Sequence, residues 1–182
     1  MRKFSLMATL ITGALSFSAL ADSPDWQYVE GGYTALDIDN AGGFDPDGAT
    51  IGGKYMLKNN IYLSGDYSFF EDHSIDIDML SLGAGYRMRI NAMTDAYVGA
   101  NYERIDSDFD DENGYSVNAG IRSRVTDQVE LAGEIGYYDV DEGDVTVKVG
   151  ANYYFTPQWA IGASYEKLDD ADITQVTARY AF

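Results

Sequence analysis

The chain has 182 residues, enough for a single domain, and its 12 basic and 30 acidic side chains give a formal charge of −18. A chain so acidic repels the phosphates of nucleic acid, which argues against DNA or RNA binding. The absence of cysteine excludes disulfide frameworks and thiolate metal sites. Nineteen glycines and fifteen tyrosines favour strands and tight turns.

The N-terminus has the three parts of a secretory signal peptide. Arg2 and Lys3 precede a mostly apolar stretch, and Ala19, Leu20 and Ala21 form a small-x-small cleavage site. We therefore expect residues 1–21 to be removed and residues 22–182 to form one domain. Loss of the two basic residues would take the charge from −18 to −20. The alternative is a short N-terminal helix of the fold.

One short pattern recurs ten times along the rest of the chain: an aliphatic residue, any residue, Gly or Ala, any residue, then usually Tyr or Ile. The ten copies begin at Val29, Ile51, Leu63, Leu82, Val98, Val117, Leu131, Val149, Ile161 and Val176. The period of two predicts ten strands, each with one apolar face. Long and short connections alternate between the copies, as expected of an antiparallel meander. The short connections carry turn residues, such as Lys58 to Asn60.

The face opposite the aliphatic stripe distinguishes a sandwich from a barrel. It carries six basic and five acidic side chains. A solvated face of so acidic a protein need not balance in sign, whereas a confined interior must, because an unpaired charge in low dielectric is costly. The pattern therefore predicts an all-β fold, a closed antiparallel up-and-down transmembrane β-barrel of ten strands. Its interior charges would be Glu30, Lys54, Asp66, Arg87, Glu103, Arg122, Arg124, Glu134, Lys148, Glu166 and Arg179. Two alternatives stay open: an eight-stranded wall with two repeats outside it, and a secreted soluble all-β domain.

The chain ends on an alternating strand with a terminal aromatic ring. Val176, Ala178, Tyr180 and Phe182 share one face of it. This ending resembles the C-terminal signature of bacterial outer-membrane β-barrel proteins. The resemblance implies that the last strand closes the barrel against the first, and that these four residues are recognised by the outer-membrane assembly machinery.

The whole mature chain is similar in pattern to the small OmpA/OmpX-like barrels, which usually have eight strands. The count of ten is closer to the ten-stranded outer-membrane family regulated by diffusible signal factor, which shares a first strand like the "YVEGGY" at residues 28–33. The resemblance implies the outer membrane of a Gram-negative bacterium as the location.

The long connections carry most of the negative charge. The segments 37–47, 71–78, 106–112, 139–144 and 169–172 hold 20 of the 30 acidic residues. They can serve as a hydrated rim, as a surface for Ca²⁺ or Mg²⁺ that bridges lipopolysaccharide phosphates, or as a site for a cationic or protein partner. Asp106, Asp108 and Asp110 begin like an EF-hand loop, but Asp111 stands where that loop needs glycine, and no glutamate follows at position twelve.

Catalytic signals are weak. His73 is the only histidine, with Glu71, Asp72 and Ser74 beside it, and the spacing places no nucleophile and base on one strand face. The interior charges have two readings: a salt-bridged plug that fixes the strand register, or the lining of a narrow water path. We expect a structural or surface-interaction role without catalysis or a resident cofactor. A narrow, porin-like channel for small polar solutes is the alternative, and an outer-membrane hydrolase is a distant third.

Overall fold

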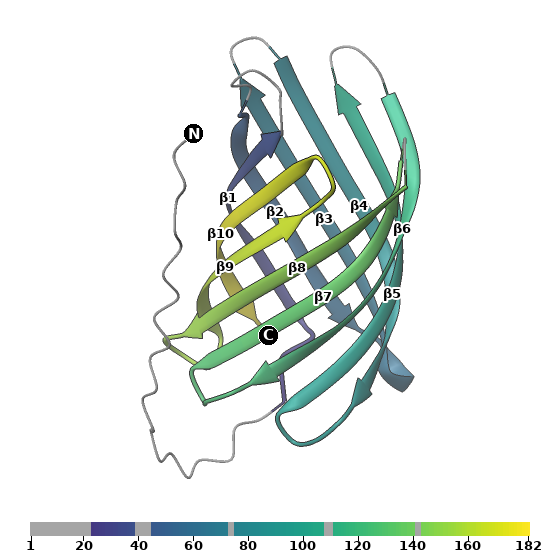
Figure 1. The fold of residues 1–182 in the computed structure, drawn as a ribbon. Coiled ribbons are helices and arrows are strands. Elements are labelled where there is room, and N and C mark those ends of the chain that lie inside the picture. Colours follow the sequence, from purple (N-terminus) through teal and green to yellow (C-terminus); the bar gives the residue numbers. More distant parts are fainter. Residues whose placement is uncertain (1–22, 39–44, 73–74, 108–110, 141–142) are drawn as a thin grey trace, which may run out of the picture.

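A computed structural model describes residues 23–38, 45–72, 75–107, 111–140 and 143–182. Within these ranges the chain forms ten antiparallel strands and one short 3₁₀ turn, and the strands close into a barrel (Figure 1). The strands are β1 (Tyr28–Ile38), β2 (Asp47–Met56), β3 (Ile61–Asp72), β4 (Ile75–Arg89), β5 (Thr94–Ser107), β6 (Asp111–Arg124), β7 (Val129–Asp139), β8 (Gly143–Tyr154), β9 (Trp159–Lys167) and β10 (Ala171–Ala181). No helix in these ranges is long and apolar enough to cross a membrane.

Every strand pairs with its neighbours in sequence, and β1 also pairs with β10, which closes the ring. The closing register places Glu30 opposite Arg179 and Tyr33 opposite Val176. All ten repeats therefore lie in the wall, so the prediction of ten strands is confirmed and the eight-stranded alternative is wrong. The turn between β2 and β3 uses Asn59 and Asn60 at φ 62°, a left-handed conformation that asparagine tolerates.

The aliphatic face of the strands points away from the barrel axis. The ten aliphatic residues that open the repeats are all between 45% and 63% exposed on the outer wall. Such a continuous apolar surface is unfavourable in water and is the outer band of a membrane barrel. The single closed sheet leaves no second layer to cover this face, which rules out the soluble sandwich.

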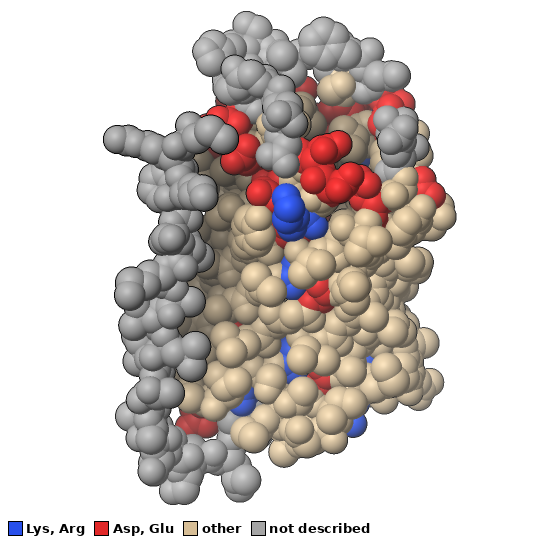
Figure 2. Space-filling model, in the orientation of Figure 1, with Lys and Arg blue, Asp and Glu red and all other residues tan. Residues whose placement is uncertain are grey.

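The strands run further than their repeats predicted. β3 continues to Asp72 and β4 begins at Ile75, and β5 continues to Ser107 before β6 begins at Asp111. Much of the sequence that was expected to form acidic loops therefore forms the paired ends of strands. Strand pairing uses backbone groups, so it can continue beyond the apolar repeats where the hairpin is exposed to water. The acidic side chains gather at the end where these hairpins project (Figure 2).

The last strand places its four signal residues on the outer wall. Tyr180 lies between two other aromatic rings, with its centroid 4.9 Å from that of Trp159 and 6.4 Å from that of Phe182. The Phe182 amide donates to the Gln27 carbonyl at 3.0 Å, so the final residue is tied to the chain entering β1. The role of these residues in assembly stays a prediction.

Replacing Phe182 with alanine should slow assembly in the membrane, because the ring is 58% exposed and free to be recognised. The measurement is the rate at which the heat-modifiable, folded band appears on gels of membrane fractions. Phe155→Ala is the matched control, since Phe155 is 57% exposed in the turn between β8 and β9. Equal rates for both variants would contradict the role given to the terminus.

Candidate functional site

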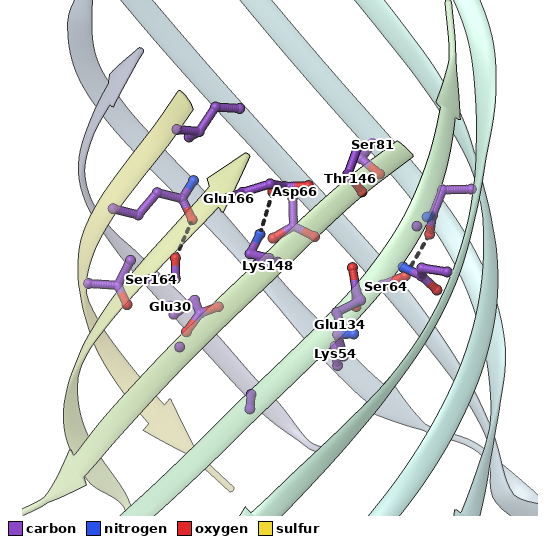
Figure 3. A pocket seen from close by; sticks show the side chains of 18 of the residues that line it. Glu30, Lys54, Ser64, Asp66, Ser81, Glu134, Thr146, Lys148, Ser164 and Glu166 are labelled. Atoms are coloured by element: carbon purple, nitrogen blue, oxygen red, sulfur yellow. Dashed lines mark hydrogen bonds and ion pairs between the residues drawn. The ribbon is translucent and has the colours of Figure 1, made fainter. Parts of the chain in front are cut away.

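The inner face of the wall surrounds a cavity of about 280 Å³ in the barrel lumen. Nine of the eleven charged residues predicted to face inward line it, namely Glu30, Lys54, Asp66, Glu103, Arg122, Glu134, Lys148, Glu166 and Arg179. Several of them come from strands on opposite sides of the barrel and point toward one another (Figure 3). The other two, Arg87 and Arg124, lie below the cavity in ion pairs with Asp95 and Glu130.

A network of buried ion pairs closes the cavity at the end where β1 begins, which is the lower end in Figure 1. The network is centred on Glu130, which is fully buried. Its Oε1 accepts from Arg122 Nε at 2.9 Å and Nη2 at 2.7 Å, while Arg179 Nη1 approaches the same oxygen at 3.5 Å. Arg124 Nε lies 3.9 Å from Oε2. Three guanidinium groups therefore converge on one carboxylate, and they are themselves only 4–7% exposed.

Aromatic rings complete this closure. Trp26, Tyr62 and Tyr97 are 1–5% exposed and pack together, with centroids 4.9 Å apart for Trp26–Tyr62 and 5.4 Å apart for Trp26–Tyr97. We call the Glu130 network together with these three rings the floor. Arg122 lies 4.8 Å from the Trp26 centroid, and Lys54 Nζ lies 4.9–5.7 Å from the centroids of all three rings. These are cation–π distances, so the rings stabilise basic groups that have left water.

The centre of the floor comes from the segment before β1 and not from the wall. Trp26 Nε1 donates to Asp95 Oδ2 at 2.8 Å, and Asp25 forms an ion pair with Arg124 at 3.0 Å. Arg89 Nη2 donates to the Ser23 hydroxyl at 2.6 Å. Burial raises the pKa of the Asp25 carboxyl, and the Arg124 guanidinium opposes that rise. Residues 23–27 therefore lie in the mouth of the barrel at the end where β1 begins, and they are held there by three strands.

Above the floor the lumen opens into a polar space that we call the chamber. Lys148 Nζ and Glu166 Oε2 form an ion pair across β8 and β9 at 3.1 Å (Figure 3). On β5, Glu103 Oε1 accepts from Ser81 at 3.0 Å and from Ser116 at 2.6 Å. Asp66 points into the same space from β3 and is exposed there. The remaining wall is mostly Ser, Thr, Asn and Gly, which leaves room for water or a small solute.

Sequence reasoning missed the most buried charges. Asp95 and Glu130 are fully buried in the floor, but each stands just before a repeat, outside the five-residue pattern. Extending the alternation back from Val98 and Leu131 would have placed both inside. Nothing in the local sequence marks Trp26, because it lies before the first strand and reaches the lumen only when the barrel closes around it.

The described residues contain no group of three or more His, Asp or Glu side chains that could hold a metal ion. Asp106 instead forms an ion pair with Arg104 at 2.9 Å on the outer wall. Asp108 and Asp110 lie outside the described residues, as do His73, Ser74 and the predicted signal peptide.

Comparison with known proteins gives a family and a fold. Residues 7–148 match a family model described as an outer membrane protein beta-barrel domain. A search of curated proteins found no match. Among solved structures, the beta domain of the Bordetella autotransporter BrkA aligns with a TM-score of 0.56 at 15% identity, covering 86% of this chain and 99% of that one. The NanC porin gives 0.55 at 8% identity, covering 86% and 100%, and the KdgM porin gives 0.50 at 13%, covering 85% and 99%. At these identities the likeness shows the fold alone.

Replacing Glu130 with alanine should lower the free energy of unfolding by about 3–5 kcal/mol, because three buried arginines lose their shared carboxylate. Urea unfolding of the barrel refolded into lipid vesicles measures this. Lys167→Ala is the control, since its ion pair with Asp172 is on the surface and the change should stay within about 1 kcal/mol. Equal stabilities for the two variants would show that the floor does not hold the barrel together.

Proposed function

The chain belongs to the outer membrane protein beta-barrel domain family, and from that membership we propose that it acts at the cell surface as a barrel closed toward the periplasm. The wall is a closed ring of ten strands in the outer membrane, with its acidic hairpin ends at the opposite end from the floor. The role is structural and interactive: the acidic rim and the chamber face the outside of the cell.

The observation that carries the proposal is the closed floor. A water path needs a continuous row of accessible polar groups, whereas Trp26, Tyr62, Arg122 and Glu130 are each no more than 4% exposed. The contacts among these side chains close the chamber at the floor. The proposal includes no catalytic step.

A second candidate function is a gated channel. It is favoured by the origin of Trp26 in the segment before β1, since a segment can leave the mouth without breaking any pair of strands in the wall. Two of the three similar structures described above are porins.

Aromatic and charged side chains lie together on the outer wall near the rim. Tyr67 donates to Asp78 Oδ1 at 2.6 Å, and Arg104 binds both Asp106 and Asp111 at 2.9 and 3.1 Å. Rings, carboxylates and one guanidinium therefore meet at the level where lipid head groups begin. We propose that Ca²⁺ or Mg²⁺ bound between these carboxylates and lipopolysaccharide phosphates joins the barrel to its leaflet.

Planar-bilayer recording of the refolded protein tests the closed floor. The natural sequence should give no discrete openings, and Trp26→Gly should give them, because the indole fills the centre of the floor. Trp159→Gly is the matched control, since the chain's other tryptophan is 45% exposed on the outer wall. Discrete openings from the unaltered protein would overturn the proposal and favour the channel.

Removal of divalent cations tests the lipopolysaccharide contact. In vesicles containing lipopolysaccharide, EDTA should lower the temperature at which the folded gel band is lost, because the carboxylates would then face bare phosphates. In vesicles of neutral phospholipid EDTA should have no such effect. An equal response in both vesicles would argue against cation bridging.

A further inference from the structure

The charges that line the lumen cavity do not balance. Six carboxylates and four basic groups line it, which leaves an excess of two negative charges. At the bottom, Glu30 pairs with Arg179 at 2.7 Å and Glu130 binds Arg122 at 2.7 Å. The lining then leaves Asp66, Glu103, Glu134 and Glu166 against Lys54 and Lys148, so the excess lies in the chamber above. Lys148 pairs with Glu166 at 3.1 Å, and Lys54 acts electrostatically on Glu134, whose Oε2 also accepts from Tyr97 at 2.6 Å.

Glu103 carries one part of this excess. Its side chain is buried, with the residue only 7% exposed, and both of its hydrogen bonds come from neutral serine hydroxyls that meet the same oxygen, Oε1. Within the described part of the chain no donor meets Oε2 and no basic group forms an ion pair with this carboxylate. A buried carboxylate with only neutral partners is costly, so a cation that reaches Oε2 would be bound.

Asp66 carries the other part. It points into the chamber and makes no hydrogen bond or ion pair with any described residue (Figure 3). Lys148 and Lys54 act on it electrostatically, but Lys148 is bound to Glu166 and Lys54 lies among the aromatic rings of the floor. Asp66 and Glu103 therefore both lack an ion pair with any described residue, and they lie on the same side of the lumen, since each pairs in register with Ser81 on the strand between them.

The rest of the lumen determines how a cation would be held. The acidic hairpin ends attract cations toward the rim end of the lumen. At the other end Lys54 and Arg122 face the chamber, and the buried floor blocks the way. A cation from outside would therefore enter the chamber and stop there.

We propose that the chamber binds a small organic dication of the diamine class, with one ammonium group at Glu103 and the other at Asp66. Two ammonium groups match the excess of two negative charges, and an aliphatic spacer suits a cavity of about 280 Å³. A single metal ion fits less well, because no three carboxylates among the described residues converge on one point. A closed floor makes the chamber a binding site, whereas an open floor would make it part of a channel. This proposal therefore rests on the function proposed above.

Isothermal titration of the refolded protein in detergent with 1,4-diaminobutane tests the proposal. Saturable binding of one molecule per barrel is expected, and 1-aminobutane, with a single charge, should bind at least tenfold more weakly. Glu103→Gln and Asp66→Asn should each weaken binding of the diamine about tenfold or more, because each removes a charged acceptor. If Glu103→Gln does not give the folded gel band, Asp66→Asn carries the test, since Asp66 has no hydrogen bond or ion pair with a described residue to lose.

The matched control is Asp139→Asn, which removes the same charge from the rim end of β7 and not from the chamber. It should leave diamine binding unchanged. Absence of saturable binding, an equal loss in Asp139→Asn, or Mg²⁺ binding with the same dependence on Asp66 and Glu103 would each overturn the proposal. Bilayer recording distinguishes the two failures: openings in the unaltered protein refute the closed floor, whereas a silent barrel that binds no diamine refutes the dication site alone.

Discussion

Three arginines that share the fully buried Glu130 form the interaction on which the rest of this barrel depends. Alternation along each strand forces polar side chains inward wherever aliphatic ones meet lipid, and the charges packed in the floor are buried away from water. The charges must then find one another across the barrel. Glu130 on β7 joins Arg122 and Arg124 on β6 to Arg179 on β10, and Arg179 in turn binds Glu30 on β1. The network thus connects strands on both sides of the closing seam.

This network also divides the lumen into two unlike halves. Below, each of the principal charges has a close partner or an aromatic ring, and the space is filled. Above, the walls are mostly small and polar, two lysines face four carboxylates, and a cavity remains. A barrel of ten strands is only slightly wider than one that side chains can fill. The difference between a plugged lumen and an open one therefore depends on a few bulky residues, with Trp26 at their centre.

The predicted interior charges and the observed ones differ in an instructive way. The pattern of repeats placed Lys148 and Glu166 on the inner face, and the register brings them within 3.1 Å. The pattern of repeats did not include Asp95, which accepts a hydrogen bond from Trp26, because the nearest repeat begins three residues later at Val98. The acidic segments were expected as loops, but pairing continues through much of them, since strand pairing depends on backbone groups that every residue carries.

The sequence by itself determined the strands, their number, the lipid-facing side and the sign of the rim. Each of these follows from local alternation, which is written into consecutive residues and needs no knowledge of the partner strand. Only the tertiary structure decided which inward charges meet, that the segment before β1 fills one mouth of the barrel, and that Glu103 and Asp66 form no ion pair with a described residue. These depend on register and closure, which bring together residues as far apart as Glu30 and Arg179, and no local pattern encodes such a distance.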